Sequence, residues 1–530
     1  MERRTRNHLS LLLLLSICVR LGVAALIRRP GYMDVAYYTA GAIRLAEGHG
    51  FSEPFIWNYL NPPSGLPHPG FLYWAPLPSL LAAPFARLSP ESFALLQIPF
   101  ALLSALLPPI AYAVAWRTTS RRHIAWLAGL ITLFSGFYIP FWSLPETFAP
   151  FAVCGSLSLW LSGQALSGSR KSIGWAVVNG LLIGIGHLAR PEAPLFLVLG
   201  IGSAFFVARS QHQEDEHHSL LEREEAAITL RYVAALLIGY LLAMAPWLLR
   251  NVLAFGTPFP STGTETVWLT NYDDLFCYDC DLSAQSYLAW GWRNILRSKL
   301  TALKVNGARF LAENCLVFLF PFALIGLYRL RHKAVYLLTS FTLATIYLVH
   351  SLLFTFPGPR GSFFHATASL LPFLFTAAGV GLSAVVRWAA RKRRWNVRQA
   401  LRVFTAQAVL GAVLLSGYAL TTKIPAWQEV DVVYEEIGGW IEQESDGPTT
   451  VMVGDPPSFW LHTRIPAVVV PNEGLEATLE VARRYDVDYL ILDPNRPAPL
   501  APLYEGDRET GAPDIERRFG RTVVYRLPDR

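Results

Sequence analysis

A group of ionisable side chains in this 530-residue sequence has the composition expected of a site for a phosphate-bearing substrate. Guanidinium groups bind phosphate through paired hydrogen bonds, whereas a carboxylate can accept the proton of an attacking hydroxyl group. All members are predicted to lie at helix ends on one side of a membrane, where ionisable residues mark functional sites. Ordinary interfacial charge is the alternative for any single member, but it explains the whole group less well. The members are Asp34, His68, Glu146, Arg190, Glu192, Arg250, Arg360 and His365.

Membrane helices are the elements that must position these residues. The sequence is 52% hydrophobic and only 16% charged, which is too apolar for an ordinary soluble protein of this length. Apolar stretches of roughly 17 to 25 residues recur, the length that crosses a ~30 Å hydrocarbon core as a helix. We therefore expect an all-α polytopic membrane protein with about eleven transmembrane helices. The expected spans are residues 9–27, 93–116, 124–141, 147–165, 173–189, 194–208, 229–249, 309–327, 334–356, 365–386 and 401–420.

Clusters of basic residues predict the orientation of these spans. Three arginines lie near the N-terminus, and the loops RTTSRR, SGSRK, RLRHK and RKRRWNVR alternate with the spans so that all fall on one side. Positively charged loops stay on the cytoplasmic side of a membrane. The mixed-charge segment 209–228 is then also cytoplasmic. The stretches expected outside are residues 28–92, the turn around Glu146, residues 250–308 and everything after Lys423.

The positive net charge of the chain does not indicate a nucleic-acid surface. The formal charge is +6, yet the segment from Thr421 to the C-terminus contains 20 acidic and 11 basic residues. The positive excess therefore lies in the short loops of the membrane part, where it orients helices.

The C-terminal segment has a different pattern from the rest. TTVMVGD, PAVVVPNEG, VDYLILD and RTVVYRL are β-rich runs, and LEATLEVARRY is an amphipathic helix. Such alternation predicts a small α/β unit with about four strands. We therefore divide the chain into a membrane domain, residues 1–423, and an extracytoplasmic α/β domain, residues 424–530.

Two cysteines fall in the large outer loop. Cys277 and Cys280 lie in FCYDCDL, in an oxidising compartment if the predicted orientation holds. A disulfide between them is favoured over two free thiols. A single CxxC pair without a second one is weak evidence for zinc or redox catalysis.

Several stretches of the membrane domain resemble the GT-C membrane glycosyltransferases, in particular the bacterial branch related to protein O-mannosyltransferases and lipid A aminoarabinose transferases. GYMDVAYYTAGAIRLAEGHGF resembles the acidic motif of the first outer loop, and HPGFLYWAPLPSLLAAPF its proline-containing juxtamembrane helix. GHLARPEAPLFLV is similar to the Arg-Pro motif, and PWLLRNVLAFGTPFPST to the exit of the seventh helix. The resemblance covers roughly residues 1 to 370.

The resemblance implies a role for individual residues. Asp34 matches the general base that deprotonates the acceptor hydroxyl, and Glu146 the second acidic residue of the second outer loop. Arg190, Arg250 and Arg360 would hold the phosphate of the lipid carrier. The chain departs from the family at two positions: Val35 follows Asp34 where many relatives have a second acid, and His68 stands before Pro69 where the aminoarabinose branch has a lysine.

Two tyrosines follow the candidate base. Tyr37 and Tyr38 are expected on a short helix with Asp34, where they pack against the sugar or anchor the chain at the membrane interface.

The expected function is transfer of a sugar from a polyprenyl-phosphate donor to a lipid, glycan or protein acceptor at the outer face of the plasma membrane. One base and no covalent intermediate suffice for inversion at the anomeric carbon, so no cofactor is required. Asp34 and Glu146 are the residues on which a divalent cation would bind.

A transporter or lipid flippase is the competing class. Such proteins place charges and broken helices near the bilayer midplane, often in two repeated halves. This sequence instead gathers its polar residues at one face and has no internal repeat. A transferase is therefore favoured.

Overall fold

Helices form most of this computed structural model. The structure describes residues 3–167, 173–212, 219–260, 262–430, 432–445, 447–506 and 513–527, so part of the predicted cytoplasmic segment 209–228 lies outside the described residues. Every expected span overlaps at least one helix. The helices concerned are α1 (Arg3–Leu26), α4 (Phe93–Ser104), α5 (Leu107–Thr119), α6 (Arg122–Leu133), α7 (Phe148–Leu166), α8 (Ile173–His187), α9 (Pro194–His212), α10 (Ser219–Phe255), α14 (Phe320–Leu330), α15 (Ala334–Leu352), α16 (Phe363–Thr367), α17 (Leu371–Arg393) and α18 (Val397–Val430).

Length and apolarity single out some of these helices as membrane spans. Six helical segments within the described ranges are long and apolar enough to cross a bilayer: Arg3–Leu26, Phe93–Thr119, Ala227–Phe255, Ala334–Leu352, Gly358–Arg393 and Val397–Glu444. Shorter apolar helices lie at Leu77–Ala86, Ile173–His187, Pro194–Phe206 and Phe320–Leu330. The structure is thus a helical membrane fold, and the number of about eleven spans stays a prediction.

The expected span 309–327 is not one continuous helix. Helix α13 (Trp292–Arg309) passes into a π-helical turn, η4 (Phe310–Asn314), and the chain then breaks before α14. Leu316 and Val317 have φ angles of 48° and 61°, a region that a β-branched residue such as valine rarely adopts. A hydrophobicity pattern contains no signal for this break.

A six-stranded sheet forms the second part of the molecule. Its order is β2-β5-β4-β6-β8-β7. The first four strands run parallel, whereas β8 pairs antiparallel with β6 and with β7. The strands are β2 (Phe55–Ile56), β4 (Val451–Val453), β5 (Ala467–Val469), β6 (Tyr489–Leu492), β7 (Asp514–Phe519) and β8 (Thr522–Arg526). The helices that accompany them are α19 (Val432–Glu444), α20 (Pro456–Thr463), α21 (Leu475–Tyr485) and α22 (Ala501–Glu505).

This sheet differs from the predicted unit of about four strands in two ways. Strand β2 comes from the first outer loop, where Phe55 pairs with Ala467 and Ile56 with Val468. Strand β7 is an exposed, charged edge strand, DIERRF, whose composition protects a sheet edge but hides the strand from a hydrophobicity pattern. The outer loop 28–92 and the C-terminal segment therefore fold together.

The first outer loop holds helix α2 (Met33–Ala46), which carries Asp34 in its first turn. A carboxylate there interacts favourably with the N-terminal end of the helix dipole. Helix α2 packs against α3 (Leu77–Ala86) and α20. Gly31, just before the helix, has a φ of 78°, and a Cβ at this position would lie 2.2 Å from Cβ of Trp427 on α18. A glycine is therefore needed where α2 begins beside α18.

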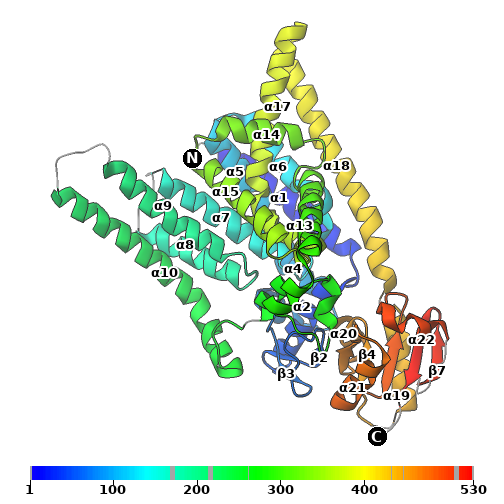
Figure 1. Cartoon of the computed structure of the whole chain (residues 1–530). Helices are drawn as coiled ribbons and strands as arrows, with labels where there is room; N and C mark the ends of the chain where they lie inside the picture. The colour runs from blue at the N-terminus through cyan, green and yellow to red at the C-terminus, as the bar shows by residue number, and fades with distance from the viewer. Residues whose placement is uncertain are drawn as a thin grey trace.

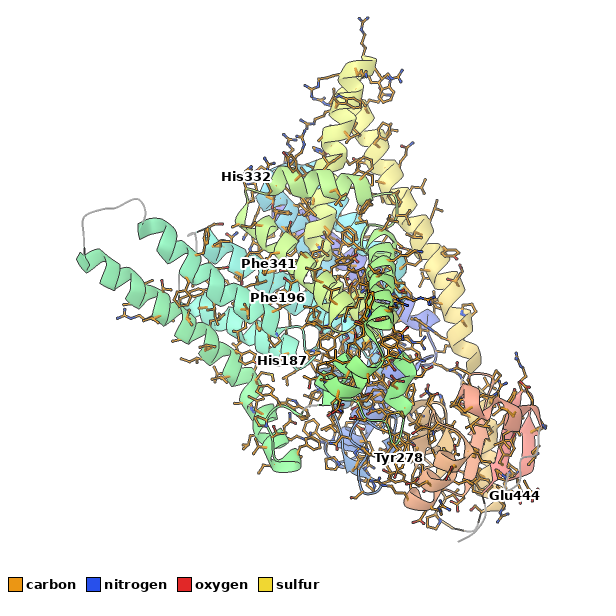
Figure 2. The ribbon with its side chains drawn as sticks, in the orientation of Figure 1. His187, Phe196, Tyr278, His332, Phe341 and Glu444 are labelled. Atoms are coloured by element: carbon orange, nitrogen blue, oxygen red, sulfur yellow. A yellow bond between two sulfur atoms is a disulfide. The ribbon has the colours of Figure 1, made fainter. Side chains whose placement is uncertain are left out.

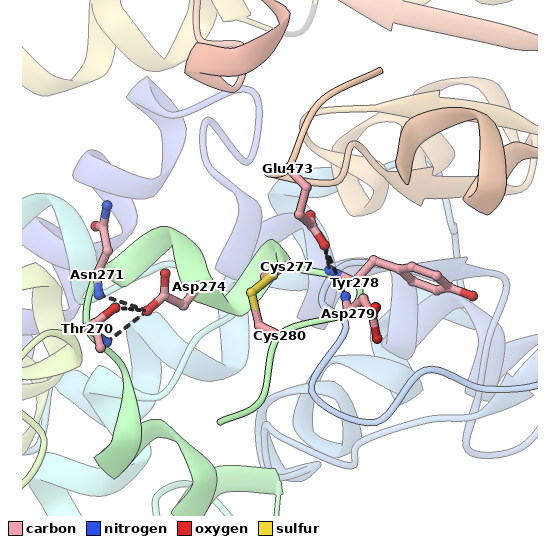
Figure 3. Close-up of a disulfide and its surroundings, with 8 residues drawn as sticks. All are labelled: Thr270, Asn271, Asp274, Cys277, Tyr278, Asp279, Cys280 and Glu473. Atoms are coloured by element: carbon pink, nitrogen blue, oxygen red, sulfur yellow. Dashed lines mark hydrogen bonds between the residues drawn. A yellow bond between two sulfur atoms is a disulfide. The ribbon is translucent and has the colours of Figure 1, made fainter. Parts of the chain in front are cut away.

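The expected disulfide is present. Cys277 and Cys280 are bonded within the large outer loop, with Cα atoms 5.6 Å apart. Figure 3 shows the carboxylate of Glu473 beside this loop, where it accepts hydrogen bonds from the backbone N–H groups of Tyr278 at 2.6 Å and Asp279 at 3.0 Å. The disulfide thus closes a turn that is attached to the C-terminal segment.

The two ends of the helical part lie beside different segments of the chain. Figure 1 shows the turn between α17 and α18 at the end of the molecule opposite the sheet. In Figure 2, His332, from the loop between α14 and α15, lies toward that same end, whereas Tyr278 and Glu444 lie at the sheet end. The basic loops RLRHK and RKRRWNVR thus lie at the end opposite the sheet, whereas residues 168–171 of SGSRK lie outside the described residues.

Candidate active site

A cavity of about 2240 Å³ lies where the helical part meets the outer loops and the sheet. Its walls come from both parts of the chain, including α2, the turns before α7 and α9, the Gly358–Ser362 turn and the loops after β4, β5 and β6. Figure 2 shows His187, another wall residue, at the end of α8. The predicted site residues at its wall are Asp34, Tyr38, Glu146, Arg190, Glu192, Arg360 and His365.

An acidic cluster lies at the N-terminal end of α2. It combines Asp34 with residues from two segments that are distant in the sequence. Asp34, Glu146 and His365 each place a ligand-type atom within 4.8 Å of those of the other two. Glu146 is almost completely buried, and His365 Nδ1 lies 3.0 Å from its Oε1. Tyr32 and Thr147 donate to the same carboxylate at 3.4 and 3.2 Å. Glu146 is thereby held by protein groups, whereas Asp34 is half-buried at the cavity wall.

The environment of Asp34 disfavours its charge. Burial, and then the nearby carboxylate of Glu146, raise the pKa of Asp34 to about 7, although the positive charge of Arg190 opposes this shift. A carboxylate with a pKa near neutrality is a stronger proton acceptor than an ordinary aspartate and is still ionised in a useful fraction. The arrangement suits a general base, and such perturbed groups occur frequently in functional sites.

A second charged group lies at the other side of this cluster. Arg190 donates from Nε and Nη2 to the two carboxylate oxygens of Glu192, at 3.0 and 2.8 Å, and its Nη1 lies 3.4 Å from Thr147 Oγ1. His350 Nε2 lies 3.1 Å from Glu192 Oε1. Burial opposes the ionised form of Glu192, but Arg190 and His350 hold its pKa below the usual range. Glu192 thus fixes Arg190 through one edge of the guanidinium group and leaves further N–H donors for a ligand.

Arg360 also lines the cavity. It lies in a π-helical turn, η5 (Gly358–Ser362), and its side chain is exposed. Its guanidinium carbon is 5.0 Å from the ring centre of Tyr272, which supports the long side chain by a cation–π contact. Two arginines therefore face one space from different elements.

The remaining predicted residues form a separate cluster away from the cavity wall. Tyr37 donates to the buried carboxylate of Glu53, which also accepts from the backbone N–H of Phe71 at 2.6 Å. His68 Nε2 lies 3.8 Å from Glu53 Oε2 and 3.0 Å from the carbonyl oxygen of Phe55.

Arg250 binds the same loop. Its Nη2 donates to the carbonyl oxygens of Phe51 and Gly70, at 3.0 and 2.8 Å. Its guanidinium carbon also lies 4.8 Å from the ring centre of Trp247. These groups hold the outer loop together, and the structure does not bring Tyr37, His68 or Arg250 to the cavity.

The acidic cluster can accommodate a divalent cation. Asp34 and Glu146 supply carboxylate oxygens and His365 an imidazole nitrogen, a donor set accepted by several divalent ions. The three ligand atoms lie close enough together that one ion could be held between them. His365 is the member of this set that sequence reasoning did not assign to a metal.

Solved membrane enzymes share this architecture. ArnT from Cupriavidus metallidurans bound to undecaprenyl phosphate aligns with a TM-score of 0.56 at 14% identity, over 98% of both chains, and its apo state with 0.55. The chain has the GT-C fold. The archaeal oligosaccharyltransferase AglB from Archaeoglobus fulgidus, in complex with an inhibitory peptide and a dolichol-phosphate, aligns with a TM-score of 0.53 at 10% identity, over 93% of this chain and 69% of that one.

No protein-family model and no curated protein matches this chain. The GT-C fold is therefore supported by the structural comparison alone. At identities this low, the structural likeness establishes the fold alone. The functional argument therefore rests on the side chains of this chain.

Sequence reasoning missed several cavity residues. His350 is an ionisable residue inside an apolar helix, a signal that could have identified it. Arg309 and Glu313 form a 2.6 Å ion pair at the wall, and their i,i+4 spacing is a signal that could have identified the pair. Asp455 and Asp493 belong to the C-terminal segment, in which sequence reasoning named no site residue.

Proposed function

We propose that this protein is a membrane glycosyltransferase that moves a sugar from a polyprenyl-phosphate donor to an acceptor hydroxyl at the extracytoplasmic face of the plasma membrane. The observation that carries the proposal is Asp34, whose pKa is raised to about 7, in one cavity with Arg190 and Arg360. A base with nearby cationic groups is what a displacement at an anomeric carbon requires when phosphate leaves.

The proposed reaction is a single displacement. The acceptor oxygen forms a bond to the anomeric carbon while the bond from that carbon to the phosphate oxygen breaks, so the configuration inverts. Asp34 takes the proton of the acceptor hydroxyl and later releases it to water. The lipid phosphate leaves with the bonding electrons, and Arg360 and the open edge of Arg190 stabilise its charge. Tyr38, at the cavity wall, packs against the bound substrates.

Glu146, His365 and Glu192 support this chemistry in our proposal. Glu146 raises the basicity of Asp34 and holds His365, while Glu192 fixes the orientation of Arg190. A divalent cation, if the enzyme uses one, would be held by Asp34, Glu146 and His365, where it would supply additional positive charge for the phosphate.

We assign a positioning role to Tyr37, His68 and Arg250. They bind Glu53 and the backbone of the first outer loop, whose helix α2 carries Asp34. In this proposal they set the position of the base and do not touch the donor phosphate.

The decisive experiment supplies radiolabelled polyprenyl-phosphate sugars to proteoliposomes that contain the purified protein, with a cell-envelope extract as the source of acceptor. A transferase consumes the labelled donor and forms a new labelled product. A transporter or flippase moves the donor between leaflets without consuming it. Movement without consumption would reject the proposal in favour of that second class.

The orientation is tested by reporter fusions. A reporter that works only outside the cytoplasm should be active when fused after Arg530 and silent when inserted in the loop 391–398. An inactive C-terminal fusion in a stable protein would place the sheet and the cavity on the cytoplasmic side and contradict the proposal.

A further inference from the structure

The cavity has a second, polar end at the C-terminal sheet. The four parallel strands of this sheet point their carboxyl ends toward it: Trp57 follows β2, Val470 follows β5, Gly454 follows β4 and Asp493 follows β6, and all of these residues line the cavity. The carboxyl ends of these strands and the proposed general base, Asp34, belong to different domains but therefore face the same cavity.

The strand order creates a crevice at this edge. Strand β4 lies between β5 and β6, and the chain runs from β4 to β5 on one side and then back past β4 to β6 on the other. In open α/β sheets, ligands bind at such a switch point, beyond the carboxyl ends of the strands. Gly454 lies in this crevice beside Asp493, and a Cβ at this position would make van der Waals contact with Asp493 Oδ2 at 3.7 Å.

The side chains around the crevice are rich in hydrogen-bonding groups. Asp455 accepts from the backbone N–H and the hydroxyl of Ser458, at 3.1 and 2.8 Å, one bond on each carboxylate oxygen. Asp493 accepts from the backbone N–H of Asn495 at 2.7 Å. Other polar wall residues at this end are Asn472, Asn495 and Arg496, beside the aromatic rings of Tyr434 and Phe519.

The two ends of the cavity thus suit different molecules. Near α10 and α15 the wall contains Met244, Trp247, Leu248, Ile346 and Val349, which match a hydrocarbon chain. At the sheet end, carboxylates and amides with neighbouring aromatic rings match vicinal hydroxyl groups and the apolar faces of sugar rings.

We propose that the switch point between β4 and β6 is the acceptor subsite and that the acceptor is a carbohydrate, bound by Asp455 and Asp493 with its reacting hydroxyl directed toward Asp34. This inference rests on the proposed function and names its acceptor class. Asp455 lies close enough to the base that its charge contributes to the raised pKa of Asp34. Asp455 and Asp34 also line the same cavity, and Asp455 caps α20, which packs against the helix α2 that carries Asp34, so an acceptor held at Asp455 would lie beside the catalytic carboxylate.

The test uses the full-length protein in lipid nanodiscs, with maltotriose, cellotriose and chitotriose as neutral carbohydrate probes and undecaprenyl phosphate as the donor-side probe. We expect at least one trisaccharide to bind to the wild type. The Asp455→Asn, Asp493→Asn double variant should weaken that binding by about tenfold or more, because two charged acceptors are lost. The Kd of undecaprenyl phosphate should not change.

Two further variants separate a binding role from damage to the fold. Gly454→Ala keeps both carboxylates and adds one methyl group toward Asp493, so it should also weaken trisaccharide binding. Glu476→Gln, an exposed carboxylate in the same domain that does not line the cavity, is the matched control and should leave it unchanged. Asparagine at position 455 preserves the N-terminal cap of α20, so the double variant should fold.

The outcomes distinguish the two proposals. If undecaprenyl phosphate binds but no trisaccharide does, or if trisaccharides bind the double variant and the wild type equally, the acceptor subsite is rejected and the glycosyltransferase proposal stands. If a serine-containing peptide or a sugar phosphate bound more tightly than the trisaccharides, and the double variant lost that binding, the acceptor would belong to that class and the carbohydrate assignment would be wrong. If undecaprenyl phosphate does not bind and no donor is consumed, the proposed function itself fails.

Discussion

Two carboxylates of the same outer loop have opposite surroundings. Glu53 is buried and receives hydrogen bonds from Tyr37 and from the backbone of Phe71, with His68 beside it. Asp34 is half-buried, faces a cavity, and has another carboxylate, Glu146, as its neighbour. Burial raises the pKa of both groups, but at Glu53 the hydrogen bonds and the positive charge of His68 oppose the shift.

The contrast shows why burial alone does not identify a catalytic group. A buried carboxylate whose lone pairs are filled by protein donors stabilises a fold, and removal of a partner leaves a buried group unsatisfied. A carboxylate that opens onto a cavity beside a like charge keeps its lone pairs for a substrate and is tuned toward neutral pH. Rate and stability should therefore respond in opposite ways to substitution at these two positions.

The largest effect is expected for Asp34→Asn. The change keeps the shape of the side chain but removes its ability to take a proton, so turnover should fall on the order of 10² to 10⁴-fold. Protein abundance, thermal stability and binding of undecaprenyl phosphate should stay as in the wild type. Transfer at the wild-type rate would show that Asp34 is only a solvated charge, and Asp34 and Glu53 would then not differ in catalytic role.

The next effect in size separates two arginines. Arg190→Lys cannot reproduce the paired hydrogen bonds to Glu192, so kcat/KM for the donor should fall by about tenfold or more. Arg250→Lys should instead lower thermal stability with little change in donor Kd, because Arg250 binds the carbonyl groups of the outer loop. If Arg250→Lys weakened donor binding and Arg190→Lys lowered only thermal stability, Arg250 would belong to the phosphate site, as the sequence suggests.

Glu53→Gln is the counterpart at the second carboxylate. The amide oxygen can still accept from Tyr37 and Phe71, but it is a weaker, uncharged acceptor, and the NH2 group replaces the oxygen that faces His68, so the free energy of unfolding should drop by about 1 to 3 kcal/mol. The folded fraction should retain its turnover per molecule. A loss of turnover as large as that of Asp34→Asn, at unchanged stability, would show that Glu53 takes part in the chemistry.

The sequence predicts the helical membrane fold well, since apolar helices carry that information along the chain, and the side of the membrane on which the cavity lies stays a prediction from the basic loops. It also selects Asp34, Glu146, Arg190, Glu192, Arg360 and His365, all of which line one cavity in the structure. It cannot tell in which direction a side chain points, and so it groups Arg250 and His68 with them. Strand β2 is only two residues long and pairs with β5 across the sequence, a contact that no local pattern reveals.

The smallest effect is a shift in pH dependence, and it tests the central claim most directly, because only a proton acceptor produces it. The rate of transfer at subsaturating donor should rise with pH, with a midpoint near 7, as Asp34 becomes ionised and active above its pKa. Glu146→Gln removes the negative charge that raises this pKa, so the midpoint should move to lower pH in that variant. A profile that is flat from about pH 5.5 to 8.5, or a midpoint that Glu146→Gln leaves in place, would contradict the assignment of Asp34 as the general base.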